Sequence, residues 1–351
     1  MCLGERKTGL CKAMAAMLAA GAMFVLPLTH AIAQAQDKTY VMKVTTPTLN
    51  DAPHQLSKNF GAAVERLSGG RIKAEIYPAS QLGSIPRQIE GVQFGAIQAA
   101  VIPPEFFVGV DERFEVMAAP GLVKSMEQGE RLAADPAVLK LMLGLGADKG
   151  LHGVAIFMNA PQSVIAKSPI RHLTDFKGKK IRIFASDFQS EAFRRLGATP
   201  VAMTLGDVLP AIQQGAIDGG VAGITVFNAF HYQDAAKYVT ETNQPQIFLM
   251  VEISRKWYES LPADLQQAVD KAAAEETVTI NPIAIDLFNK ARKSWTDTGG
   301  ELISLPQDEQ AQMMQTLSSV GDDVSKSKPG VREAYEIVTA AAKRTRVAPS
   351  Q

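Results

Sequence analysis

A single arginine inside an apolar strand constrains this chain more than any other feature. Arg182 lies between two isoleucines, where a charge is costly unless it is paired or faces a cleft. From 176 to 243, the spacing of apolar residues predicts a strand, a helix, a short strand, a helix and a glycine-rich turn at 215–220. Open α/β sheets bind ligands at the carboxyl ends of their strands. The stretch therefore predicts an α/β lobe that presents a fixed cation at a strand end.

The first 33 residues have the pattern of a secretory signal peptide. Three basic residues precede an apolar run at 13–28, and Ala31-Ile32-Ala33-Gln34 then matches an A-x-A cleavage site. The run is shorter than the ~20 apolar residues that a transmembrane helix needs, and an uncleaved membrane anchor is the alternative. We predict cleavage near Ala33 and a secreted protein.

Cleavage at this place would remove Cys2 and Cys11, which are the two cysteines of the chain. The remaining length, about 315 residues, is enough for a core that is stable without disulfides and for two lobes. Losing three basic residues and one acidic residue leaves a net charge of about −2, which excludes a basic surface for nucleic acid. No later segment is long and apolar enough to span a membrane.

The periodicity of the apolar residues predicts the elements around this lobe. We expect strands at 40–45, 72–76, 97–102, 154–157 and 248–253. We expect helices at 60–67, 85–94, 265–272 and 280–298, and a crossover at 161–169. The βαβαβ order at the start indicates a parallel, doubly wound sheet, to which the strand at 248–253 would return the chain.

Motifs of enzymes and metal sites are missing from the sequence. His54, His152, His172 and His231 are scattered singly, and none of the common protease, hydrolase, phosphate-binding or dinucleotide-binding motifs is present. No histidine and carboxylate cluster has the spacing of a metal site. We therefore predict a protein that is not an enzyme and holds no cofactor or metal. A catalytic pair built from distant residues is the alternative.

Three blocks of the sequence resemble the DctP-type solute-binding proteins of TRAP (tripartite ATP-independent periplasmic) transporters. The first block is Tyr77-Pro78-Ala79-Ser80-Gln81-Leu82-Gly83-Ser84, and the last runs from Trp257 to Ala274. In the middle block the matching residues are Asp175, Gly178, Lys180, Arg182, Gly197, Ala198, Pro200, Met203, Val208, Ala211, Gln213, Gln214, Gly215, Asp218, Gly219, Lys237, Tyr238, Thr242 and Asn243. The three blocks together span most of the chain.

The resemblance implies the periplasmic binding protein fold, with two α/β lobes, a hinge and a ligand cleft between the lobes. We then expect lobe one at 38–159 and 249–287, lobe two at 160–248 and 288–345, and a helix near 281–298 that spans both. It also implies that the protein captures a small organic carboxylate and delivers it to TRAP integral membrane subunits. We expect a monomer without a nucleic-acid partner.

Arg182 is the residue to which the resemblance gives a role. In the family, this position holds the arginine that grips the ligand's carboxylate, and a guanidinium suits the task because its planar fork donates two parallel hydrogen bonds. The alternative is a structural salt bridge to Asp207 or Asp218. We interpret both acids as structural, with Asp207 capping a helix that begins at Val208.

Departures from the family pattern bear on specificity. Gln162 stands where members that take sugar acids often have a second arginine, Ala222 replaces the usual asparagine, and Leu205 replaces a frequent phenylalanine. A buried polar group without a partner costs ~1–3 kcal/mol, so a pocket with few polar groups favours a carboxylate with an apolar or aromatic body. The predicted ligand contacts are Arg182, Gln162, Asn159, Phe106, Phe184, Ser186, Leu205 and Ala222.

Other ligands and roles stay open at this point. A C4-dicarboxylate or other polar acid would need a second cation in the cleft, and a ligand-sensing subunit for a membrane receptor would use the same fold. Phe107, Phe157 and Phe227 are further candidates for the apolar wall, with core packing as the alternative. His54 follows the first strand and is a candidate for the mouth of the cleft, with a solvated loop as the alternative.

Overall fold

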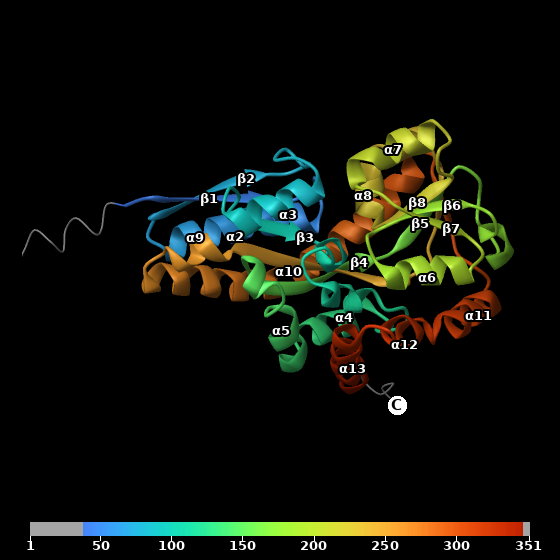
Figure 1. Ribbon diagram of the computed structural model, residues 1–351. Coiled ribbons are helices and arrows are strands. Elements are labelled where there is room, and N and C mark those ends of the chain that lie inside the picture. The colour runs from blue at the N-terminus through green and yellow to red at the C-terminus, as the bar shows by residue number, and fades with distance from the viewer. Residues whose placement is uncertain (1–37, 347–351) are drawn as a thin grey trace, which may run out of the picture. The chain divides into compact units, whose positions relative to one another are not determined.

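The computed structural model describes residues 38–346 of the 351-residue chain (Figure 1). The predicted signal peptide at 1–33 and its cleavage near Ala33 lie outside the described residues. Among residues 38–346, no helix combines the length and the apolar composition needed to cross a membrane. This part of the chain forms two β-sheets with helices packed around them.

The first sheet has five strands in the order β2-β1-β3-β10-β4. They are β1 (Tyr40–Thr45), β2 (Ile72–Tyr77), β3 (Ala99–Ile102), β4 (Leu151–Pro161) and β10 (Gln246–Ser254). β1 and β3 are parallel, whereas β10 is antiparallel to both β3 and β4. β10 confirms that the chain returns to this sheet near 248–253. The parallel pairing of β1 and β3 agrees with the prediction from the βαβαβ order, and the direction of β10 makes the sheet as a whole mixed.

The second sheet has six strands in the order β11-β9-β5-β8-β6-β7. They are β5 (Ser163–Ala166), β6 (Lys180–Ile183), β7 (Thr199–Ala202), β8 (Gly219–Ala222), β9 (Tyr238–Thr240) and β11 (Glu301–Ile303). β6 is parallel to β7 and β8, and β5 is antiparallel to β8 and β9. Arg182 lies on β6, between β7 and β8, as the sequence predicted for a cation within a strand.

Two predictions for this sheet are wrong. The segment 161–169, predicted as a crossover, contains β5, and the end of the glycine-rich turn belongs to β8. A Cβ atom added to Gly219 would collide with the carbonyl oxygen of Ile165 in β5, so glycine lets the two strands lie close together. Glycine is a poor strand signal in sequence, which explains why a turn was predicted.

The helices cover the strands and continue to the C-terminal part of the chain. Those of the first half are α2 (Ala52–Leu67), α3 (Ile85–Phe94), α4 (Met126–Ala133), α5 (Pro136–Met142) and the 3-10 helices η1 (Pro104–Phe107), η2 (Glu112–Ala118) and η3 (Ala147–Lys149). Those of the middle are η4 (Leu173–Phe176), α6 (Asp187–Arg195), α7 (Leu205–Gln213), α8 (Ile224–Ala229) and η5 (Tyr232–Asp234). The last are α9 (Arg255–Glu259), α10 (Ala263–Asp297), α11 (Gln307–Leu317), α12 (Val320–Ser325) and α13 (Pro329–Arg344).

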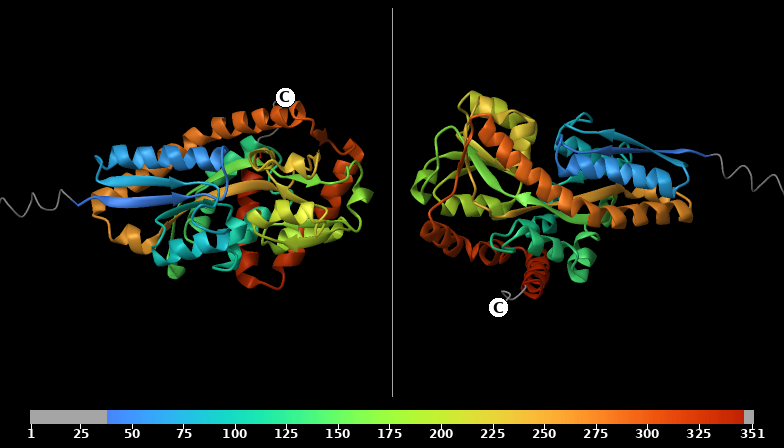
Figure 2. Two further views of the ribbon diagram at one scale, coloured as in Figure 1. Left: turned by 90° about the horizontal axis from the view of Figure 1, so that it is seen from above. Right: turned by 180° about the vertical axis from the view of Figure 1, so that it is seen from behind.

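Helix α10 contacts elements of both sheets. It packs against α2 and β4 on one side and against α8 and β11 on the other, and Figure 2 shows it as one continuous orange helix. The sequence predicted two helical stretches, but the structure has a single helix of 35 residues with Pro282 inside it. None of the residues between Ala273 and Ile280 is buried, so the apolar pattern on which the prediction rested is interrupted there.

The hydrophobic cores lie along the two sheets. Every residue of β3 and β10 is buried, and α3 packs against both of these strands. Beside the second sheet, Trp295 of α10 lies 6.3 Å from Phe227 of α8, measured between ring centroids. At the C-terminal end, α11 and α12 pack against α6, and α13 packs against α5 and η2. The strands that carry the candidate site are therefore flanked by well-packed, buried elements.

Candidate ligand-binding site

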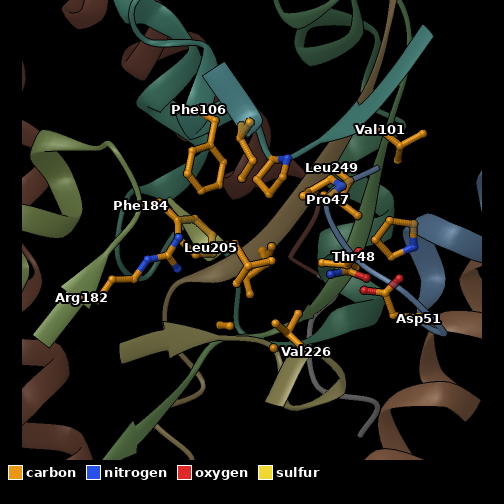
Figure 3. A pocket seen from close by; sticks show the side chains of 17 residues that line it. Pro47, Thr48, Asp51, Val101, Phe106, Arg182, Phe184, Leu205, Val226 and Leu249 are labelled. Carbon is orange, nitrogen blue, oxygen red and sulfur yellow. The ribbon is translucent and has the colours of Figure 1, made fainter. Parts of the chain in front are cut away.

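A cavity is lined by elements of both sheets (Figure 3). The β1–α2 loop, α3, β3, η1, β4 and β10 line it from the first sheet, and β6, β8, α7 and α8 line it from the second. Most of the lining residues are apolar, and Arg182 is the one cationic side chain among those described. A mostly apolar lining with a few polar and charged groups is typical of a site for a small molecule.

Arg182 reaches the cavity from β6 and is almost fully buried, with 1% of its surface exposed. Its Nε donates a hydrogen bond to the carbonyl oxygen of Met203 at 2.9 Å, and its Nη1 donates to that of Val221 at 3.1 Å. Nη2 has no hydrogen-bond partner in the described structure. The two backbone bonds fix the orientation of the guanidinium and leave Nη2 available to a ligand.

The charge of Arg182 is only partly compensated by the protein. Burial lowers the pKa of Arg182 to about 10, against the opposing influence of the Tyr232 hydroxyl, so the side chain is still a cation at neutral pH. Its Cζ lies 5.9 Å and 5.0 Å from the ring centroids of Phe106 and Phe184, and such cation–π contacts contribute about 0.5–2 kcal/mol. An anionic ligand would complete the compensation.

The alternative of a structural salt bridge for Arg182 finds no support in the geometry. Asp218 accepts a hydrogen bond from the amide of Lys180 at 2.7 Å, and within residues 38–346 no carboxylate lies within salt-bridge distance of Arg182. Asp207 does not cap a helix that begins at Val208, so this prediction is wrong. α7 begins earlier, with Thr204 as its N-cap. Asp207 lies in the first turn, where a negative charge interacts favourably with the helix dipole.

The structure brings together six of the eight residues predicted as ligand contacts. These are Asn159, Phe106, Phe184, Arg182, Leu205 and Ala222, which come from β4, η1, β6, α7 and β8 and, for Phe184, from the segment directly after β6. Figure 3 shows Phe106, Phe184 and Leu205 around the guanidinium of Arg182. Their contact with a ligand stays a prediction. Gln162 and Ser186 do not line the cavity.

Gln162 supports the site indirectly, through hydrogen bonds to a residue that contacts the cavity-lining segment. It is fully buried, and its Oε1 accepts a hydrogen bond from Nε2 of Gln189 at 3.2 Å. The Oε1 of Gln189 in turn accepts from the amide of Phe184 at 2.9 Å. Gln162 therefore helps to hold the segment that carries Phe184, and the sequence alone could not separate this supporting position from direct contact.

Ser186 is the N-cap of α6. Its hydroxyl accepts hydrogen bonds from the amides of Phe188 and Gln189 and lies 3.3 Å from Oε2 of Glu115. We predict that Ser186→Ala lowers the free energy of unfolding by about 1 kcal/mol and leaves ligand affinity unchanged, as measured by urea unfolding and by calorimetric titration. Ser125→Ala, at the N-cap of α4, is the matched control. A loss of affinity with unchanged stability would instead make Ser186 a ligand contact.

The sequence did not identify Asp51 as a candidate, although it lines the cavity. It is 1% exposed, its Oδ1 accepts from the amide of His54 at 3.2 Å, and its Oδ2 has no partner in the described structure. Burial raises the pKa of Asp51 to about 6, while the Thr48 hydroxyl and the His54 amide act in the opposite direction. Its place directly after the first strand was the available signal, because ligands bind at strand ends.

The remaining candidates lie elsewhere. His54 is buried and accepts a hydrogen bond on Nδ1 from the amide of Asn50, so it closes a turn and does not line the cavity. Phe107, Phe157 and Phe227 are buried away from the cavity. In the described part of the chain, no group of three His, Cys, Asp or Glu side chains is arranged to hold a metal ion.

The comparison with known families decides what kind of protein carries this site. The family model of DctP, described as bacterial extracellular solute-binding protein, family 7, matches residues 44–327. The chain belongs to the DctP family. The prediction of a DctP-type solute-binding protein of the TRAP class is thereby confirmed, and so is the periplasmic binding protein fold with two α/β lobes.

Individual relatives agree with this assignment. The C4-dicarboxylate-binding periplasmic protein DctP of Rhodobacter capsulatus is 29% identical over 269 residues, which are 76% of this chain and 80% of the relative. A TRAP periplasmic solute-binding protein from Desulfovibrio salexigens, with bound orotic acid, has a similar fold with a TM-score of 0.82, 20% identity, and coverage of 88% of this chain and 100% of the other. The sugar acid binding protein DctPAm from Advenella mimigardefordensis, in complex with galactonate, gives a TM-score of 0.83, 20% identity and coverage of 88% and 99%.

Proposed function

We propose that this DctP-family protein binds a small organic carboxylate in the cavity through Arg182 and delivers it to TRAP integral membrane subunits. The observation that carries the proposal is the free Nη2 donor of a buried guanidinium that has no carboxylate partner in residues 38–346. A carboxylate oxygen at this donor would offset the desolvation of the cation, and a second oxygen would share Nη1 in the two-bond geometry that arginine favours.

The shape of the wall favours an apolar or aromatic body for this carboxylate. Phe106, Phe184 and Leu205 surround the arginine, and Ala222 and Val226 continue the apolar surface. The similar proteins bind acids as different as C4-dicarboxylates, orotic acid and galactonate, and these ligands share a carboxylate. A C4-dicarboxylate is the less favoured candidate here, because the described lining contributes no second cation.

We propose that the lobes divide as the sequence predicts, at 38–159 with 249–287 and at 160–248 with 288–345, with α13 of the second lobe packed back against α5 and η2 of the first. The arrangement of the sheets supports this division, because the chain leaves the first sheet at the end of β4 and re-enters it at β10. α10 contacts both halves, as a helix near 281–298 that spans the lobes would. A ligand held by both lobes would favour the closed arrangement over an open one.

The location, oligomeric state and partners that we propose rest on membership of the DctP family. We propose that the mature protein is periplasmic after cleavage near Ala33, acts as a monomer, has no nucleic-acid partner and catalyses no reaction. Relatives that carry the word periplasmic in their names support the location. TRAP solute-binding proteins among the similar structures support the membrane partner.

A thermal-shift panel tests the proposed ligand class. The chain from Gln34 onward would be refolded from denaturant to remove carried-over ligand and then mixed with apolar, aromatic, hydroxylated and dicarboxylic acids. A ligand at a hundredfold excess over its Kd raises the free energy of unfolding by about 2.7 kcal/mol. We expect stabilisation by monocarboxylic acids and none by their uncharged amides. Equal stabilisation by acid and amide, or a response to sugars without a carboxylate, would contradict the proposal.

A further inference from the structure

We propose that Asp51 is a second ligand-binding group, which selects carboxylates that carry a hydrogen-bond donor at the end remote from Arg182 and which disfavours dicarboxylates. This inference rests on the proposed function of the same cavity. It goes further by naming a feature of the ligand other than its carboxylate, and by assigning a specificity role to a residue of the β1–α2 loop.

The position of Asp51 in the cavity supports a direct contact. Asp51 and Thr48 line the cavity from the β1–α2 loop, and Figure 3 shows the two on the side opposite to Arg182 and Phe184. No hydrogen bond or ion pair joins Asp51 to Arg182 in the described structure. A ligand that fills the space between them would therefore meet the guanidinium at one end and the carboxyl group of Asp51 at the other.

Helix capping accounts for only one of the two carboxyl oxygens of Asp51. Asp51 is the N-cap of α2, and the amide of His54 bonds to its Oδ1. The Thr48 hydroxyl lies near the carboxyl group, but Oδ2 is buried and no group of the described residues makes a hydrogen bond of good geometry to it, which is unfavourable. Serine or asparagine would cap the helix equally well without leaving a buried, unpaired carboxylate oxygen. A donor on the ligand would satisfy Oδ2 and remove this cost.

The residues that line the cavity indicate which hydrogen-bond donor a ligand would carry near Asp51. Arg182 is the only cation among the described lining residues, so the Asp51 end of the cavity has no positive group to receive a second carboxylate. A dicarboxylate would place its second negative charge beside a buried acid, which is unfavourable. A hydroxyl, an amide N–H or an ammonium group would instead donate to Oδ2, and the apolar wall between the two ends suits a hydrocarbon linker.

Two matched series of acids test this inference by isothermal titration calorimetry at pH 7.5. One series is butyrate, 4-hydroxybutyrate, 4-aminobutyrate and succinate, and the other is benzoate, 4-hydroxybenzoate, 4-aminobenzoate and terephthalate. We expect the best donor-bearing acid to bind roughly tenfold or more tightly than its unsubstituted parent, because a hydrogen bond to a charged group contributes about 1.5–3 kcal/mol. The dicarboxylate of the same series should bind more weakly than the donor-bearing acid.

The variant Asp51→Asn separates the ligand contact from the cap. Asparagine retains the capping oxygen but replaces the second acceptor with an amide donor, so we expect the preference for donor-bearing acids to fall at least about tenfold and dicarboxylate binding to improve. Asp135→Asn, at the N-cap of α5 outside the cavity, is the matched control and should leave the preference unchanged. If Asp51→Asn fails to fold, the comparison of acids on the unaltered protein still tests the selection.

The results distinguish this inference from the proposed function. If unsubstituted acids bind as well as their donor-bearing relatives, and Asp51→Asn does not change the ratio, the role of Asp51 is overturned while carboxylate binding stands. A dicarboxylate that binds more tightly than every other member of its series would also overturn it. If no carboxylate binds at all, both proposals fail together.

Discussion

Replacing Arg182 with methionine should abolish carboxylate binding and leave the fold intact. Truncating one partner of a buried, hydrogen-bonded charge pair costs 2–5 kcal/mol or more of binding free energy, so we expect affinity to fall at least about 30-fold. Methionine has a similar length without the charge and removes the donor Nη2, which has no partner in the described protein. The change would be measured by titrating the tightest-binding acid of the panel into both proteins.

Stability gives this variant a second, independent readout. Breaking a buried ion pair destabilises a protein by about 3–5 kcal/mol, but Arg182 has no carboxylate partner within residues 38–346. The loss in Arg182→Met should therefore be smaller and limited to the hydrogen bonds to Met203 and Val221. Arg194→Met, on the exposed side of α6, is the matched control. Large destabilisation together with unchanged ligand affinity would give Arg182 a structural role and contradict our assignment.

Replacing Glu252 should make the protein more stable at neutral and alkaline pH. Glu252 lies on β10 opposite Ala100 and Gly153, is fully buried, and has no partner for either carboxyl oxygen in the described structure. Burial raises the pKa of Glu252 well above its usual value of 4.5. We expect Glu252→Met, which fills a similar volume without polar atoms, to raise the free energy of unfolding by about 1–3 kcal/mol at pH 8.

The pH dependence of this gain has a definite sign. The folded-state pKa of Glu252 lies above the unfolded-state value, so its favourable contribution is fully present below pH 4.5 and is lost as the pH rises toward the folded-state pKa. The advantage of Glu252→Met over the unaltered protein should therefore grow from pH 4.5 to pH 8 in urea unfolding. Glu333→Gln on the exposed surface of α13 is the control. An advantage that stays constant over this pH range would contradict the assignment.

The sequence identified Arg182 because a charge inside an apolar strand is rare and needs a compensating partner. It identified Leu205 and Ala222 because the resemblance to the family placed them in the cleft, and both line the cavity. Gln162 and Ser186 were predicted from the same reasoning, yet Oε1 of Gln162 accepts a hydrogen bond from Gln189 and the Ser186 hydroxyl accepts one from the amide of Phe188. Local sequence cannot tell a side chain that faces the cavity from one that bonds to the adjacent helix.

Asp51 shows the opposite limitation. An aspartate before Ala-Pro-His at the start of a helix is fully accounted for as an N-cap, and nothing in the local pattern shows that its second oxygen is buried without a partner. That fact depends on the approach of β3, β4 and β8 around the same cavity. The strands β5 and β8 were missed for a related reason, because each has only four residues and forms through pairing with a distant segment, and β8 begins with two glycines.

The position of the bound carboxylate is the most direct test of the account. A crystal structure with the tightest acid of the panel should show a carboxylate oxygen within hydrogen-bonding distance, about 3 Å, of Nη2 of Arg182, with the body of the ligand against Phe106 and Phe184. A ligand whose carboxylate lies elsewhere in the cavity, with Nη2 of Arg182 still without an anion, would contradict the central claim that Arg182 binds the carboxylate.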